Sequence, residues 1–233
     1  VYQYQNNQGK HRAINKGVGL ASGAYFFILD SDDYLPINAL LTTRIKIDLI
    51  YSNDSFAGVC GRRCYRDGAI IGSGFKGEIQ SNSLDIRFLH KIKGDMVEVF
   101  KTNVLKKNLF PIFDNECFCP EALVWNRIAQ NYNLLFFEES IYVCEYLTDG
   151  LTSNIVKIRM ESPKASMLYY SELFMAPIPL VQKLKALVNF WRFSFNSTSP
   201  FLDKYKHINK FKSLLFYPLG FFLFLKDQIN IKH

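Results

Sequence analysis

The sequence lacks the short motifs that most directly identify a catalytic chemistry. It has no GxSxG, Walker A or Rossmann glycine pattern, and its four histidines are scattered without an HExxH-type spacing. These absences argue against a nucleophile-elbow hydrolase, a P-loop enzyme, a dinucleotide-binding enzyme and a zinc peptidase. Any catalytic site must be built from other groups.

The five cysteines contain no CxxC pair, and their number is odd. This favours reduced thiols over a disulfide framework and predicts a cytoplasmic protein. Cys117, Cys119 and Cys144 could form a soft-metal site, but buried apolar thiols are the better interpretation.

Long apolar runs are also missing. The longest, residues 214–225, has about a dozen residues and is interrupted by Pro218 and Gly220, so it is too short for a span of about 20 residues. No signal peptide is recognisable at the amino end. An apolar fraction of 48% and a charged fraction of 21% allow a packed core, and 233 residues are expected to form one domain, or one domain with an appendage.

Acidic residues are scarce in the last quarter of the chain. Residues 179–233 hold nine Lys or Arg and two Asp, whereas residues 1–178 hold 19 of each sign. This basic segment, which also carries twelve aromatic residues, predicts contact with an anionic membrane surface through residues 204–226. The alternative is a helical cap that packs back on the body. Nucleic acid is not an expected partner, because the aliphatic and aromatic residues 214–225 follow one another without a charged residue among them.

The apolar pattern predicts helices at residues 10–21, 36–51, 121–131, 155–175 and 180–195. It predicts strands at residues 1–4, 25–29, 56–60, 69–71, 96–100, 134–137 and 141–146, with a hairpin around residues 66–68. The domain assignment is an α/β domain over residues 1–154 and a helical tail over residues 155–233.

The most informative stretch is a short apolar strand that runs directly into carboxylates. Residues 25–29 are all apolar and are followed by Asp30, Asp32 and Asp33. We expect a strand buried on both faces whose carboxyl end holds a divalent cation, Mg²⁺ or Mn²⁺. The alternative is that Asp32 or Asp33 caps the helix near Pro36.

A second group of residues precedes this strand. It comprises a glycine at a helix start, two basic side chains and two asparagines: Asn7, Gly9, Lys10, Arg12 and Asn15. A helix N-terminus with nearby positive charge attracts phosphate. A solvated amphipathic helix is the alternative.

Together the two segments resemble the family 2 glycosyltransferases. The shared pattern is Asn-x-Gly-Lys-x-x-Ala-x-Asn, a small-residue stop, the apolar strand and Asp-Ser-Asp-Asp; it is dense over residues 7–35 and looser to about Asn154. The resemblance implies a GT-A fold, that is, a three-layer α/β sandwich with a mostly parallel sheet, and a nucleotide-sugar donor.

The resemblance also implies roles for single residues. Asp30 would face the nucleoside, Asp32 would ligate a divalent metal on the diphosphate, and Asp33 would assist that metal through water. Lys10 and Arg12 would contact the nucleotide. Asn15 is expected to be structural.

An inverting transfer needs a base, and the family places it at a helix start. Here that position is Glu121, although Ala122 stands where the family commonly has Asp. Glu116 is a rival. The alternative for Glu121 is a favourable charge in the first helical turn.

Three further features have weaker signals. Trp125 could stack on an acceptor sugar, with core packing as the alternative, and Asp95 and Glu98 could lie on the acceptor side. Residues 149–152 could close over the donor or form a surface turn.

The family begins with strands that Val1 to His233 do not include. We therefore expect an amino-terminally truncated or defective chain that binds sugar nucleotides weakly. The expected reaction is metal-dependent, inverting transfer from a UDP-sugar to a saccharide or lipid-linked acceptor, in surface polysaccharide synthesis at the inner face of the plasma membrane. A nucleotidyltransferase and a non-catalytic binding module are the alternatives.

Overall fold

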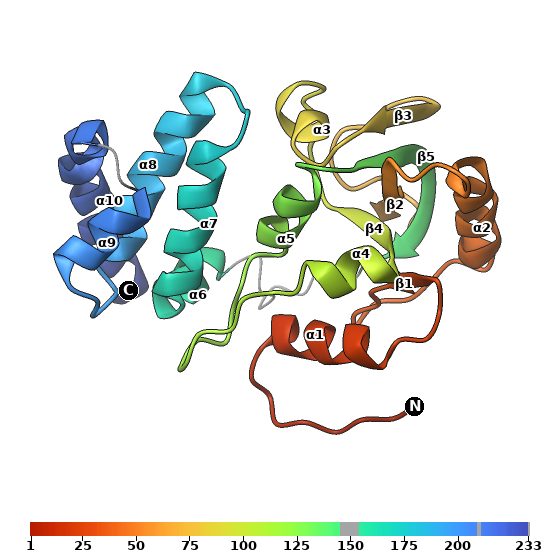
Figure 1. The fold of residues 1–233 in the computed structure, drawn as a ribbon, viewed down its shortest axis with the longest axis horizontal. Helices are drawn as coiled ribbons and strands as arrows, with labels where there is room; N and C mark the ends of the chain where they lie inside the picture. Colours follow the sequence, from red (N-terminus) through yellow and green to blue (C-terminus); the bar gives the residue numbers. More distant parts are fainter. Residues whose placement is uncertain (145–153, 209–210, 233) are drawn as a thin grey trace. The chain divides into compact units, whose positions relative to one another are not determined.

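The computed structural model describes residues 1–144, 154–208 and 211–232 (Figure 1). The chain divides into two compact units. The first, called here the helical unit, consists of Val1–Asn15, Phe110–Val124 and Thr148–His233. The second, called the sheet unit, consists of Lys16–Leu109 and Trp125–Leu147.

The sheet unit contains a five-stranded sheet in the order β1-β4-β2-β5-β3. Only β2 and β5 are parallel; the other three neighbouring pairs are antiparallel. The α/β class is confirmed, but the expected mostly parallel sheet is wrong. The strands are β1 (Tyr25–Phe27), β2 (Phe56–Cys64), β3 (Glu78–Ser81), β4 (Met96–Lys101) and β5 (Asn133–Val143).

Strand β1 differs from its prediction in two ways. It lies at the edge of the described sheet, so its side chains are half-buried rather than buried on both faces. It pairs antiparallel with β4, with Phe26 opposite Phe100. A short apolar run does not distinguish these environments, because an antiparallel sheet also buries apolar residues on its packed face.

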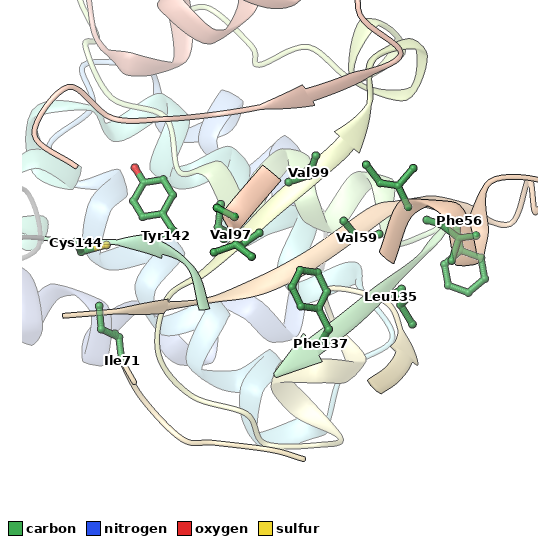
Figure 2. Packing of buried hydrophobic residues seen from close by; sticks show 13 residues of the cluster. Phe56, Val59, Ile71, Val97, Val99, Leu135, Phe137, Tyr142 and Cys144 are labelled. Atoms are coloured by element: carbon green, nitrogen blue, oxygen red, sulfur yellow. The ribbon is translucent and has the colours of Figure 1, made fainter. Parts of the chain in front are cut away.

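The core of the sheet unit lies between the sheet and helix α2 (Ala39–Ile50). Figure 2 shows its aromatic and aliphatic side chains on β2, β4 and β5, including Val59, Val99 and Phe137. Ala39, Ile47 and Ile50 are also buried members of this cluster. Each fully buried large side chain contributes about 1.5–3 kcal/mol. Phe27 of β1 packs against this cluster, with its ring 6.5 Å from that of Tyr142 on β5.

Two other local predictions are partly right. The hairpin after β2 exists, with Tyr65 and Ala69 hydrogen bonded, but its second arm is only an isolated bridge between Cys64 and Ile70. Val1 to Tyr4 form no strand, since they have no strand partner among the described residues. The remaining helices of the sheet unit are α3 (Asp85–Phe88) and α4 (Thr102–Lys107).

Helix α1 (Lys10–Leu20) begins in the helical unit and ends in the sheet unit, as does α5 (Glu121–Ile128). Both confirm predicted helices. The predicted helix 155–175 is two helices, because the chain breaks at Ser162 and Pro163 occupies the first turn of the second.

The helical unit is built around Trp191, which is fully buried. Its indole Nε1 donates to the Ser213 carbonyl at 2.9 Å, and Met167, Leu187 and Phe190 belong to the same cluster. The helices are α6 (Ile155–Glu161), α7 (Pro163–Met175), α8 (Leu180–Ser194), α9 (Phe201–Ile208), the 3₁₀ helix η1 (Phe211–Phe216) and α10 (Tyr217–Lys232).

In the part of the chain that the structure describes, no single helix is long and apolar enough to cross a membrane. Helices α9 and α10 satisfy such a test only as a pair, bent by 113°.

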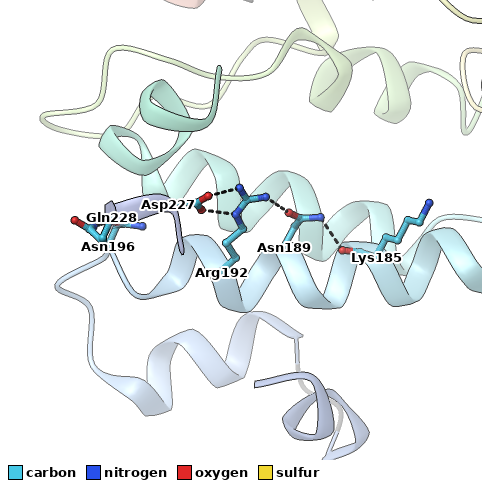
Figure 3. A network of polar contacts seen from close by, with 6 residues as sticks. All are labelled: Lys185, Asn189, Arg192, Asn196, Asp227 and Gln228. Carbon is cyan, nitrogen blue, oxygen red and sulfur yellow. Dashed lines mark hydrogen bonds and ion pairs between the residues drawn. The ribbon is translucent and has the colours of Figure 1, made fainter. Parts of the chain in front are cut away.

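Helix α10 packs against α8 through a small residue and an ion pair. A Cβ at Gly220 would lie 2.6 Å from the Trp191 Cβ. The guanidinium of Arg192 donates to both carboxylate oxygens of Asp227, at 2.5 and 2.6 Å. It also donates to the side-chain oxygen of Asn189 at 3.2 Å (Figure 3). The close approach and the ion pair fix which side of α10 faces α8.

We expect Gly220→Ala to lower the free energy of unfolding of the helical unit by about 1–3 kcal/mol, because the added methyl group overpacks the α8 contact. Urea unfolding followed by tryptophan fluorescence measures this. The control is Gly19→Ala, also within a helix, where a Cβ meets nothing within 4 Å and helix propensity predicts a gain of up to about 1 kcal/mol. Equal effects of the two substitutions would contradict the packing argument.

Candidate functional site

The three predicted metal and nucleotide carboxylates lie in a turn, residues 30–33, that follows β1 in the sheet unit. We call it the acidic turn. The Asp33 amide donates to the Asp30 carbonyl at 3.3 Å. Asp32 is exposed, whereas Asp30 and Asp33 are half-buried. Asp32 is thus the carboxylate most open to a ligand from solvent.

The acidic turn is held by the end of β5. The Asp30 amide donates to the hydroxyl of Tyr142 at 2.9 Å, and the Asp33 side chain is hydrogen bonded to the same hydroxyl. Tyr34 and Val143 exchange backbone hydrogen bonds at 3.2 and 2.9 Å. Tyr142 is not among the residues predicted from the sequence, because a tyrosine within an apolar strand is typical of core packing.

Tyr142 is fully buried and has a cation beneath its ring. The Arg63 guanidinium lies 4.4 Å from the ring centroid and donates to the Met96 carbonyl at 3.0 Å and to the Cys144 Sγ at 3.7 Å. Burial raises the pKa of Tyr142, and the charge of Asp30 and the bond to Asp33 act in the same direction. The phenol therefore stays protonated at physiological pH.

The carboxylates do not form a closed metal cage. Among the described residues, no group of three His, Cys, Asp or Glu side chains is arranged to hold a metal ion. The chemistry of the acidic turn nevertheless suits Mg²⁺ or Mn²⁺, since Mg²⁺ is commonly held by one or two carboxylates while substrate phosphates and water complete its shell. The acidic turn fits an ion that arrives with a phosphorylated substrate.

The second predicted group, on α1, mainly holds the loop of residues 110–119 within the helical unit. Gly9 has φ +95°, and a Cβ there would lie 1.8 Å from the Cys117 carbonyl oxygen. Asn15 exchanges two hydrogen bonds of 2.9 Å with the backbone of Phe110. These two residues of the sequence pattern therefore shape the loop that leads to α5.

Arg12 also holds the loop of residues 110–119. Its Nη2 donates to the Phe113 carbonyl at 2.9 Å. Part of the guanidinium predicted to contact nucleotide is thus engaged with the loop, and its nucleotide role stays a prediction.

Lys10 and Glu121, predicted as nucleotide contact and base, lie together. The Lys10 Nζ is 2.9 Å from the Glu121 Oε1, and the two side chains are 35% and 33% exposed. Each is the first residue of its helix, α1 and α5 respectively. The structure therefore brings a cation and a carboxylate together at a half-buried position in the helical unit.

Glu116, the rival base, caps helix α7. Its two carboxylate oxygens accept the backbone amides of Lys164 and Ala165 at 2.7 and 2.9 Å, and only 5% of the residue is exposed. Burial raises the pKa of Glu116, and the two amide donors partly offset that shift. Both oxygens are therefore engaged in capping the start of α7.

The weaker candidates are distributed as follows. Trp125 is buried against Phe100, with ring centroids 4.6 Å apart, so core packing is correct. Asp95 is exposed and Glu98 is half-buried on β4. All five cysteines are free. Residues 149–152 lie outside the described residues.

A pocket of about 490 Å³ lies in the sheet unit, at the opposite end of β1 from the acidic turn. Tyr25, Lys101 and Lys106 contribute to its lining. Both lysines donate to backbone carbonyls, of Asn53 and Ala21. The pocket is separate from the predicted site residues.

Comparison with known proteins gives a family match over part of the chain and a similar fold. Residues 1–63 match the sequence model of "Glycosyl transferase family 2". No curated protein sequence matches the chain. Three crystal structures of TarS from S. aureus are similar at 15–17% identity, which shows the fold alone.

The TarS 1-349 complex with UDP-GlcNAc gives a TM-score of 0.55 at 15% identity, covering 94% of this chain and 61% of that one. TarS 1-349 alone gives a TM-score of 0.51 at 16% identity, covering 91% of this chain and 58% of that one. TarS gives a TM-score of 0.52 at 17% identity, covering 90% of this chain and 35% of that one. The present chain therefore spans about a third to three fifths of these chains.

We expect Tyr142→Phe to lower the free energy of unfolding by about 1–3 kcal/mol, because the Asp30 amide loses its acceptor. Since folding raises the pKa of Tyr142, its contribution is complete below the ordinary value of about 10 and is lost as pH rises above it. The variant should lose part of the alkaline decline in stability. Urea unfolding between neutral and alkaline pH measures both effects.

The matched control is Tyr2→Phe, since Tyr2 is 90% exposed. If Tyr142→Phe left both the free energy of unfolding and its decline at alkaline pH unchanged, Tyr142 would not hold the acidic turn.

Proposed function

We propose that this chain is a family 2 glycosyltransferase that transfers a sugar, with inversion and with a divalent metal, from a nucleotide-sugar donor to a saccharide or lipid-linked acceptor. The observation that carries the proposal is the acidic turn, which lies within the matched residues 1–63 and exposes Asp32. The similarity to TarS in complex with UDP-GlcNAc supports a UDP-sugar as donor.

On the donor side, Asp32 is the proposed metal ligand, with Asp33 beside it and Asp30 toward the nucleoside. Asp33 is the poorer ligand, because its side chain is hydrogen bonded to Tyr142. Mg²⁺ or Mn²⁺ would neutralise negative charge that develops on the leaving diphosphate. Tyr142 binds the Asp30 amide and the Asp33 side chain, and so restrains the acidic turn against the repulsion between its carboxylates.

On the acceptor side, Glu121 is the proposed base. An acceptor hydroxyl oxygen attacks the anomeric carbon, the bond from that carbon to the diphosphate oxygen breaks, and the diphosphate leaves with the electron pair. The hydroxyl proton passes to the Glu121 carboxylate. Glu116 is a poor candidate for this step, because both its oxygens accept amide hydrogens of α7.

Lys10 serves the same carboxylate in this proposal. Its ammonium lies 2.9 Å from the Glu121 Oε1 and so helps to fix the position of that oxygen. Lys10 and Arg12 are also the proposed nucleotide contacts. A phosphate that draws Lys10 away would leave Glu121 open to the acceptor hydroxyl.

The proposed setting is the cytoplasmic face of the plasma membrane, in surface polysaccharide synthesis. The basic and aromatic composition of residues 179–233 supports this setting.

We expect Asp32→Asn in the full-length protein to reduce metal-dependent release of UDP from UDP-GlcNAc by about a hundredfold or more, because the lost charge stabilisation is worth several kcal/mol. Activity with and without Mn²⁺ measures this. Asp54→Asn, at another exposed carboxylate of the sheet unit, is the control and should keep its activity. Undiminished metal-dependent transfer by Asp32→Asn would exclude the metal assignment.

We expect Glu121→Gln to reduce kcat by about 10²–10⁴-fold, the usual contribution of a general base, with UDP affinity nearly unchanged. Single-turnover sugar transfer and a UDP titration separate the two effects. The comparison variant is Glu116→Gln, which should lower thermal stability through the weakened α7 cap but retain kcat per folded molecule. If Glu116→Gln lost kcat while Glu121→Gln retained it, Glu116 would be the base.

A further inference from the structure

Helix α10 has apolar side chains on two opposite sides. Its inner side packs on α8, where Gly220 meets Trp191 and Asp227 binds Arg192. The aromatic ring of Phe224 also packs there, 5.4 Å from Phe195. A helix that is apolar all round is normally buried all round, yet in the described part of the chain the opposite side of α10 is left exposed.

The opposite side carries a row of exposed apolar residues, called here the outer stripe. Its members, three or four residues apart and therefore on one helix face, are 50%, 62%, 44% and 61% exposed: Leu219, Phe222, Leu225 and Ile229. Leu215, one turn earlier in η1, is 77% exposed. Contiguous apolar surface of this kind marks an interaction site.

The charge of the segment that carries the outer stripe selects the partner. The two acidic residues of the segment 179–233 are both ion-paired, Asp227 with Arg192 and Asp203 with Lys206 at 2.9 Å. Lys226 lies exposed between Leu225 and Asp227 on α10. An apolar stripe in a segment with nine basic residues complements a surface that combines negative charge with hydrocarbon.

We propose that the outer stripe of α10 docks the protein on an anionic membrane, with the helix lying in the plane of the interface. Leu219, Phe222 and Ile229 enter the boundary between head groups and acyl chains, and Lys226 lies near the phosphates, as in other in-plane helices. The inference rests on the membrane setting of the proposed function and identifies the surface that provides it. Docking would hold the chain near a lipid-linked acceptor.

Vesicle co-sedimentation of the full chain tests this proposal. Wild type should bind phosphatidylcholine vesicles that contain phosphatidylglycerol more tightly than pure phosphatidylcholine vesicles, and added salt should weaken the binding. The double variant Leu219→Gln with Phe222→Gln should lower the partition coefficient about tenfold or more, given the transfer free energy of two such side chains. Lys226→Gln should weaken binding to the anionic vesicles only.

The matched control is the double variant Leu41→Gln with Ile45→Gln on α2, where the two residues are 63% and 53% exposed. It removes a comparable apolar exposure from the sheet unit and should bind as wild type does. The proposal is overturned by equal loss in the two double variants or by absence of binding to anionic vesicles. It is also overturned if the α10 variant abolishes a dimer of the chain that binds no vesicles, since a second copy would then cover the stripe.

A UDP titration of the same variants separates this inference from the sugar-transfer chemistry. UDP affinity is expected to be the same in wild type and both double variants. Vesicle binding that fails while UDP binding persists overturns the docking surface alone. UDP binding that fails in every variant while docking persists counts against the proposed reaction.

Discussion

The hydrogen bond from the Asp30 amide to the Tyr142 hydroxyl is the contact on which the acidic turn depends. Three carboxylates within four residues repel one another, and a turn at the end of an edge strand has few neighbours to restrain it. Tyr142 supplies that restraint from a position 112 residues later in the chain. Because it is buried between Phe27 and Arg63, its position is set by the core. The acidic turn is thus held in place by its hydrogen bond to a buried side chain of β5.

The residues of the α1 pattern have an architectural task beside any task toward a ligand. Gly9, Arg12 and Asn15 hold the backbone of the loop that leads to α5, whereas Lys10 points to Glu121. The charged pair is therefore positioned by hydrogen bonds that neither of its members makes. A substitution at Asn15 would disturb Glu121 without touching it, so loss of activity there would not by itself identify a ligand contact.

Local features could be predicted from the sequence, and long-range pairings could not. Helix periodicity placed α1, α2 and α5, and the carboxylates after residues 25–29 marked the acidic turn. The predicted parallel direction was wrong for β1, because a three-residue apolar strand has the same sequence pattern in parallel and antiparallel sheets. The cap on α7 by Glu116 and the clamp by Tyr142 join segments 48 and 112 residues apart. A single sequence gives no signal for such pairs.

The Arg192–Asp227 ion pair explains why one particular side of α10 is left exposed. A buried ion pair adds little to stability over apolar packing, but breaking it costs about 3–5 kcal/mol, because an unpaired charge would remain in the core. Asp227 and Gly220 lie two helical turns apart and so share a face. Rotating α10 to bury the outer stripe would remove Asp227 from Arg192 and move Gly220 away from Trp191. The polar contact therefore selects between two apolar faces that hydrophobicity alone would treat alike, and it leaves Leu219, Phe222 and Ile229 on the outside.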